Sequence, residues 1–195
     1  MRYTRPDRPR GFTLVELLVA MAVFGLLLAS ALPSYGEFIR NSQIRTAAQS
    51  IESGLQIARA EAVRGNAQVQ FQLPGTLAGT AVAGGTDWAV MGTLAATPTV
   101  FDQVVGTRTE PNASSVARVG VAAAASGASS APGAGLPATV TFTGLGRLSA
   151  ATAVRQIDVT GPAGSRSLAV QITPGGDIRL CDPALVRAAD PQGCA

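Results

Sequence analysis

The sequence predicts an α+β protein in which one long N-terminal helix packs on a head of antiparallel β-strands. An unbroken apolar run covers residues 12–32, and apolar residues then recur at helical spacing up to residue 64. Beyond residue 67, apolar and polar residues alternate with a period of two, which is typical of half-buried strands. Because the helix precedes every strand candidate, the order indicates α+β rather than alternating α/β.

The composition excludes several classes of protein. The chain has 195 residues, 47% of them hydrophobic and 14% charged, which suits one folded domain with an appendage and excludes a highly charged disordered chain. Histidine and lysine are both missing, which removes Ser-His-Asp catalysis, histidine metal sites and Schiff-base chemistry. The carboxylates of Asp158, Asp177 and Asp182 are attributed to turns and edge strands. We therefore predict no enzyme activity, no cofactor and no metal site.

The positive charge is concentrated at the N-terminus. Residues 1–10 hold four arginines and one aspartate, a local charge of +3 that equals the net charge of the whole chain. The pI of about 9.5 therefore belongs to this segment, and no basic surface for nucleic acid follows from it. A basic start that ends at Gly11 and precedes an apolar run is typical of an export or membrane signal.

The apolar run of residues 12–32 is long enough to cross a membrane, since a helix of this length spans roughly 31 Å. The arginines before it favour a cytoplasmic N-terminus, and Pro33 predicts a kink directly after it. A transmembrane anchor fits, and so does a secretory signal cleaved after Ala31, which would release a soluble β-rich binding domain or enzyme. Neither explains Glu16, because a carboxylate near the centre of a membrane helix costs about 2.5–3.5 kcal/mol, and somewhat less near its end.

The string from Arg10 to Glu16, Arg-Gly-Phe-Thr-Leu-Val-Glu, resembles the class III signal of type IV pilins and type II secretion pseudopilins. The resemblance implies that a prepilin peptidase cuts after Gly11 and N-methylates the new amine of Phe12. In an assembled filament, Glu16 would meet the Phe12 ammonium of a neighbouring subunit, which offsets the cost of burying the carboxylate and fixes the axial register. The implied partners are other pilins or pseudopilins, the peptidase and the inner membrane.

The second half of the helix is amphipathic. Residues 34–64 carry an apolar stripe at alternating spacings of four and three, and the Gly65-Asn66 pair predicts the helix end. We therefore expect one helix in two halves, kinked near Pro33. The stripe consists of Ile44, Ala48, Ile51, Leu55, Ala58 and Ala62.

The rest of the chain alternates between strand candidates and loops. Two candidates flank Gly161-Pro162-Ala163-Gly164, which predicts a hairpin. Residues 74–86 and 121–137 are expected to be loops; the second is uncharged and is interpreted as a flexible surface loop, with a recognition loop as the alternative. The candidates are residues 68–73, 87–91, 99–105, 116–122, 139–143, 154–160 and 167–173.

Two later motifs resemble those of the GspH/FimT group of minor pilins and pseudopilins. Ile57 to Ala62 resembles the group's "ARSEA" signature at the helix end, and Thr141 to Leu148 resembles its "F-x-x-x-G" strand and turn. This resemblance implies a head of two packed antiparallel sheets beside the helix.

The C-terminal tail holds both cysteines of the chain, Cys181 and Cys194. In an exported chain this pair predicts one disulfide, worth roughly 3 kcal/mol in the chain-entropy model. In some FimT proteins the tail binds DNA through a Gly-Arg-x-Arg motif, and the matching segment here is Gly176 to Arg179. Asp177 replaces the first arginine and repels phosphate, so Arg179 and Arg187 are only minor candidates for DNA contacts.

Together these observations predict a minor pilin of the type IV pilus that acts in pilus assembly or in the tip complex. The alternatives are a GspH-like type II secretion pseudopilin, a FimT-like DNA-uptake pilin and the secreted domain. The expected parts are a leader (1–11), a transmembrane helix and filament core (12–33), an amphipathic helix (34–66) and a β-rich head (67–195). The protein would cross the inner membrane once, with a periplasmic head, before it enters a pilus or pseudopilus.

Overall fold

The computed structural model describes residues 11–73, 85–94, 97–108 and 116–194, without the side chains of residues 30–34, 94 and 97–100. The chain divides into two units between Phe38 and Ile39, each described by itself. Helix α1 (Leu14–Gly65) contributes to both units, whereas all the described strands belong to the second, which is called the head below.

Both ends of α1 are capped by residues next to it. The Glu16 amide donates a hydrogen bond to Thr13 Oγ1 at 3.2 Å, so Thr13 acts as the N-cap residue. At the other end, Asn66 has a positive φ of 44°, and the Ala67 amide donates to the Ala62 carbonyl at 3.2 Å. The predicted stop at Gly65-Asn66 is therefore confirmed. The helix runs unbroken through residue 33, and the kink expected there stays a prediction.

The apolar stripe of α1 forms the centre of the head, as the spacing predicts. Its six residues are completely buried, together with Phe71 and Phe142 from the strands. The chain's one tryptophan, Trp88, packs its ring 5.7 Å from that of Phe71 and donates from Nε1 to Ser50 Oγ at 2.9 Å. The helix and the sheets therefore share one core.

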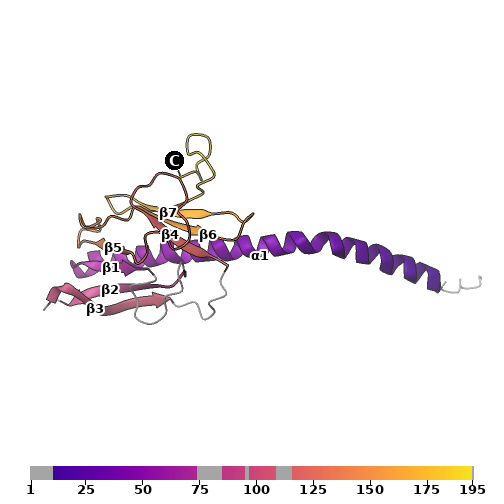
Figure 1. Ribbon diagram of the computed structural model, residues 1–195. Coiled ribbons are helices and arrows are strands. Elements are labelled where there is room, and N and C mark those ends of the chain that lie inside the picture. Colours follow the sequence, from indigo (N-terminus) through magenta and orange to yellow (C-terminus); the bar gives the residue numbers. More distant parts are fainter. Residues whose placement is uncertain (1–10, 74–84, 95–96, 109–115, 195) are drawn as a thin grey trace, which may run out of the picture. The chain divides into compact units, whose positions relative to one another are not determined.

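The head holds two four-stranded antiparallel sheets, whose strands gather about the C-terminal half of α1 (Figure 1). The first sheet, sheet A, has the order β3-β2-β1-β5 and sheet B has the order β4-β6-β7-β8. The two-sheet head implied by the family resemblance is confirmed. The strands are β1 (Val69–Gln72), β2 (Trp88–Leu94), β3 (Thr97–Arg108), β4 (Arg118–Ala122), β5 (Thr139–Phe142), β6 (Gln156–Thr160), β7 (Leu168–Ile172) and β8 (Ile178–Cys181).

The seven predicted strands correspond to β1 to β7, and the predicted hairpin is the β6–β7 pair. Strand β8 was not predicted, because its four residues contain only two periods of alternating apolar and polar residues and follow directly after the Pro-Gly-Gly turn. It nevertheless pairs along its whole length with β7, from Ile178 opposite Ile172 to Cys181 opposite Ala169.

The predicted loop of residues 121–137 begins within β4, which extends to Ala122, and the rest is a surface segment that is tied to sheet B. The Val121 amide donates to the Ala134 carbonyl at 2.9 Å, and the Gly133 amide donates to the Val119 carbonyl at 2.8 Å. These bonds use backbone groups of β4, which is an edge strand, so the segment covers that edge. Most of the other predicted loop, residues 74–84, lies outside the described residues.

Candidate functional site

The predicted processing site lies directly before α1. Gly11 is exposed, and a Cβ added to it would meet no atom within 4 Å. Phe12 follows with 85% of its surface exposed. Among the described residues, no contact requires a glycine at residue 11. A glycine there is compatible with the predicted recognition by a peptidase. Cleavage at Gly11 and methylation of Phe12 stay predictions.

Glu16 occupies the first turn of α1, where a carboxylate is favoured by the helix dipole. Its side chain is exposed, and its backbone amide is the group that Thr13 caps. The spacing Thr-x-x-Glu matches a capping pattern, visible in the sequence but not among the predictions, and the hydrogen bond seen here uses the Glu16 amide rather than its carboxylate. Capping by Thr13 does not exclude the predicted pairing of Glu16 with the Phe12 ammonium of another subunit, which stays a prediction.

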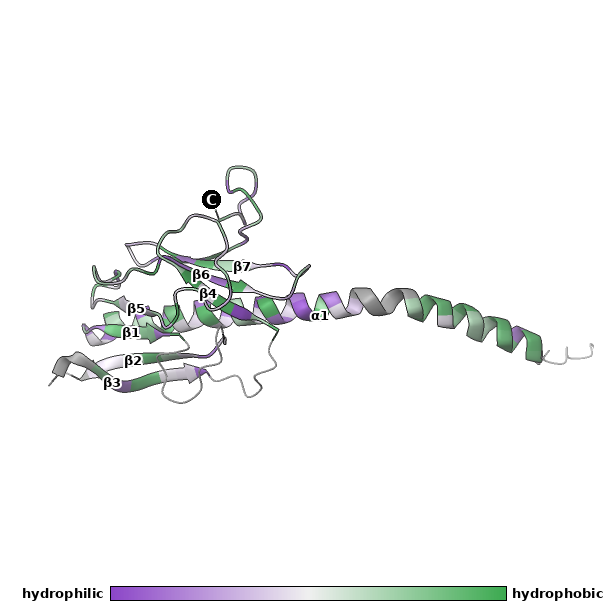
Figure 2. Cartoon of the chain, viewed as in Figure 1, coloured by the Kyte–Doolittle hydropathy of each residue, from purple (hydrophilic) through white to green (hydrophobic). Residues whose placement is uncertain are grey.

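The apolar side chains on both sides of Glu16 form a surface that the described residues leave exposed. The large hydrophobic residues between Phe12 and Leu28 are 49% to 85% exposed, and Figure 2 shows this part of α1 as predominantly hydrophobic. Among the residues that the structure describes, none of the helices is both long and apolar enough to traverse a membrane. An exposed apolar surface of this extent is typical of contact with lipid or other protein.

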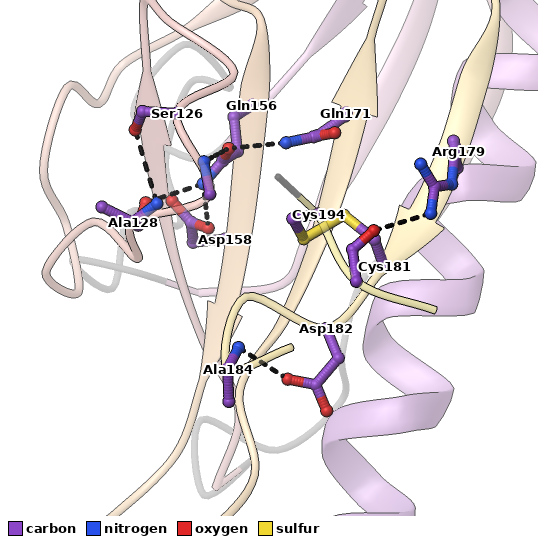
Figure 3. Close-up of a disulfide and its surroundings, with 12 residues drawn as sticks. Ser126, Ala128, Gln156, Asp158, Gln171, Arg179, Cys181, Asp182, Ala184 and Cys194 are labelled. Atoms are coloured by element: carbon purple, nitrogen blue, oxygen red, sulfur yellow. Dashed lines mark hydrogen bonds between the residues drawn. A yellow bond between two sulfur atoms is a disulfide. The ribbon is translucent and has the colours of Figure 1, made fainter. Parts of the chain in front are cut away.

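In the head, buried polar residues hold the loop over sheet B (Figure 3). Asp158 is completely buried; it accepts hydrogen bonds from the Ser130 amide and from Gln156 Nε2, both at 2.8 Å. Gln156 Nε2 also donates to the Ala128 carbonyl at 2.8 Å. The edge-strand explanation of Asp158 is therefore wrong, because β6 lies between β4 and β7 and the loop encloses the carboxylate. A buried carboxylate needs such donors, which the sequence does not reveal.

The other two carboxylates do lie in turns. The Asp177 amide donates to Thr173 Oγ1 at 3.1 Å in the β7–β8 turn, and its carboxylate lies 3.7 Å from Arg59. Asp182 Oδ1 accepts from the Ala184 amide at 2.9 Å, and its other oxygen accepts from Arg166 at 2.7 Å. These contacts confirm the turn interpretation of both residues. No group of three or more potential metal ligands occurs among the described residues.

The predicted disulfide between Cys181 and Cys194 is confirmed and ties the C-terminal loop to β8 (Figure 3). Both cysteines are buried and form a small apolar cluster with Ala169 on β7. Arg179 donates from Nη2 to the carbonyls of Pro191 and Gly193, both at 2.6 Å. The loop is thus held at β8 by a covalent bond and by an arginine.

These contacts bear on the two DNA candidates. Arg179 directs its guanidinium to backbone carbonyls of the C-terminal loop, so part of its donor capacity is used inside the head. Arg187 is exposed within the same loop. DNA binding by either residue stays a prediction, and only Arg187 presents an exposed side chain for it.

The two family motifs meet at the end of α1. A Cβ on Gly146, which has a φ of +71°, would lie 2.9 Å from Val63 and 3.4 Å from Arg59. Gly176, with a φ of +90°, sits directly against the Gly146 carbonyl. The helix signature and the glycine turn therefore occur together because the turn packs on the helix without room for side chains.

One ion pair marks the same end of the helix. Arg64 Nε donates to Glu61 Oε2 at 2.8 Å, and the two side chains make a second contact through Arg64 Nη2. The hydrogen bond from Arg64 holds the pKa of Glu61 below its ordinary value. Arg64 also lies in the last turn, where a cation is favoured by the helix dipole.

Comparison with known proteins identifies the family. A model described as "Type II transport protein GspH" matches residues 47–176, which is most of the chain. The chain belongs to the GspH family. Residues 7–32, a segment that contains Gly11, Phe12 and Glu16, match a second model, "Prokaryotic N-terminal methylation motif". The predicted pilin or pseudopilin class is thereby confirmed.

The chain is also similar to a curated fimbrial protein over a short segment and to a solved structure in its fold. The type IV major fimbrial protein FimA of Dichelobacter nodosus is 42% identical over 52 residues, which cover 27% of this chain and 32% of the relative. The chain thus spans about a third of the length of this curated relative. The type IV minor pilin FimU of Pseudomonas aeruginosa has a similar fold, with a TM-score of 0.51 and 18% identity over 81% of this chain and 99% of that chain. At this identity the likeness concerns the fold alone.

Proposed function

We propose that this chain is a minor pilin of the type IV pilus that acts in pilus assembly or the tip complex and catalyses no reaction. One observation carries the proposal: a glycine at which an added Cβ would meet no described atom precedes an exposed apolar helix that begins at Leu14 and holds one carboxylate, Glu16, in its first turn. Cleavage after Gly11 would create an ammonium four residues before Glu16. In apolar surroundings, each charge would stabilise the other.

In this proposal the chain first resides in the inner membrane and later in the filament. Residues 12–33 would cross the membrane once and place the head in the periplasm, and the same helix would then pack among the helices of other subunits. The exposed side chains between Phe12 and Leu28 support both environments, because lipid and neighbouring helices cover apolar surface equally well. Other pilins and the prepilin peptidase are the proposed partners.

The mature N-terminus tests the proposal. In the native host we expect mass spectrometry to find a chain that begins at a methylated Phe12. We expect Gly11→Glu to retain the leader, whereas Glu37→Gln, a substitution at an exposed helix residue, is processed normally. A mature chain that begins at Leu32, or normal processing of Gly11→Glu, would contradict the proposal.

A second candidate is a minor pseudopilin of a type II secretion system, which the description of the matched family favours. The physical requirements on Gly11, Phe12 and Glu16 are the same in both machines. Deletion of the gene separates them: loss of pili with normal secretion of exoproteins supports the pilus. The opposite result supports the pseudopilus.

A further inference from the structure

Two aromatic side chains lie just beyond the apolar run, on a part of α1 that the described residues leave exposed. Tyr35 is 65% exposed and Phe38 is 70% exposed. They are three residues apart and therefore neighbours on one face of the helix, whereas Glu37 points to the side roughly opposite Tyr35. Large aromatic side chains with this exposure call for a partner.

Their distance from the apolar run identifies the partner. Tyr35 follows Leu32 by three residues and Phe38 by six, or about 4.5 Å and 9 Å along the helix axis. The polar region of a bilayer extends roughly 5–7 Å beyond the hydrocarbon on each side. Helical side chains tilt toward the N-terminus, which brings both rings back toward the hydrocarbon boundary. If Leu32 lies at the hydrocarbon boundary, as the proposed membrane anchor requires, both rings reach the depth of the lipid headgroups.

We propose that Tyr35 and Phe38 form an interfacial collar that binds the lipid headgroup region on the periplasmic side of the membrane. The chemistry fits, because an aromatic ring prefers the boundary between hydrocarbon and water, and a tyrosine hydroxyl can reach the polar side. Phe12 lies at the other end of the apolar run with 85% of its surface exposed, so aromatic residues stand at both boundaries. The collar rests on the membrane anchoring of the proposed function and adds to it the depth at which the anchor is held.

The depth of single tryptophans tests the collar. The full-length chain is reconstituted at low density in phosphatidylcholine vesicles whose acyl chains carry bromine near the headgroup or near the chain end. Tryptophan is introduced by Tyr35→Trp or Phe38→Trp, and the emission of Trp88, the chain's one native tryptophan, is subtracted using the parent. We expect about twofold stronger quenching by the shallow bromine than by the deep one, since the interface is only roughly 5–7 Å thick.

Two further variants make each outcome decisive. Met21→Trp, inside the apolar run, should be quenched most by the deep bromine. Arg45→Trp, an exposed helix residue about 10 Å beyond Phe38, should not be quenched, which shows that an introduced tryptophan does not pull the helix into the membrane. If Met21→Trp is not quenched, the membrane anchor of the proposed function is wrong. If Met21→Trp is quenched but the collar variants are unquenched, or quenched most by the deep bromine, the collar is overturned while the anchor remains.

Discussion

The two units of this chain differ in the exposure of their apolar side chains. In the head, Ile44, Ile51 and Leu55 of α1 are completely buried against the two sheets. In the first unit, the same helix leaves Phe12, Leu14 and their apolar successors exposed. Burial of apolar surface is favourable by roughly 25 cal/mol per Å², so covering these side chains with lipid or other subunits, as the proposed function requires, would be stabilising. The apolar side chains of the head are thus accounted for by its own fold. Those of the first unit are accounted for only by the contacts with lipid or other subunits that the proposed function includes.

The largest effect is expected from removing the carboxylate of Glu16, which lies among the exposed apolar side chains of the first unit. We expect Glu16→Ala to lower incorporation into filaments roughly a hundredfold or more. The variant would leave the Phe12 ammonium of a neighbouring subunit without its partner, and an unpaired charge in apolar surroundings costs about 3–5 kcal/mol. Capping of α1 should survive, since Thr13 accepts its hydrogen bond from the backbone amide of residue 16. Incorporation is measured by quantifying the protein in sheared filaments against the total in cells.

Thr13→Ala is the matched control for this prediction. It removes the cap, which is worth about 0.5–2 kcal/mol, but leaves the carboxylate of Glu16 in place. Incorporation should fall much less than with Glu16→Ala. Equal losses in the two variants would show that Glu16 acts through the helix start alone, and the predicted pairing with Phe12 would be wrong.

Removal of the disulfide should affect the stability of the head and leave the first unit unchanged. We expect the double variant Cys181→Ala/Cys194→Ala to lower the free energy of unfolding by roughly 3 kcal/mol, because the bond closes a short loop in the unfolded chain. Leader removal should be unchanged, since the bond lies wholly in the head. Guanidinium unfolding followed by Trp88 fluorescence measures the loss, and a variant as stable as the parent would contradict it.

The sequence predicts features that depend on a repeating pattern of residues better than features that depend on contacts formed only in the folded chain. The buried stripe of α1 and seven of the strands follow from spacing, and the disulfide follows from the cysteine count. Strand β8 escapes prediction because four residues carry too little periodicity. The burial of Asp158 escapes it because the donors come from Ser130 and Gln156, and only the folded loop brings Ser130 to β6. The roles predicted for Gly11, Phe12 and Glu16 involve other molecules, so the fold of this chain alone does not test them.

The loop over sheet B offers a finer test of the head. We expect Asp158→Asn to lower the free energy of unfolding by about 1–3 kcal/mol, because one carboxylate oxygen becomes a donor that faces another donor inside the protein. Backbone amide exchange near Ser130 should accelerate more than exchange in β1. Ser129→Ala, at an exposed residue of the same loop, is the matched control and should change neither quantity substantially. Unchanged stability of Asp158→Asn would mean that the network does not hold the loop.

The smallest effect is expected from the ion pair at the end of α1. Because Arg64 lowers the pKa of Glu61, the pair contributes stability above the ordinary carboxyl pKa and loses it as the pH falls through the lowered value. Glu61→Gln should therefore lower the melting temperature slightly at neutral pH and not at strongly acidic pH, where the parent's carboxyl is protonated. The pair is at the surface, so salt should shrink the difference at neutral pH. A difference that persists in acid would assign the effect to packing of the Glu61 side chain instead.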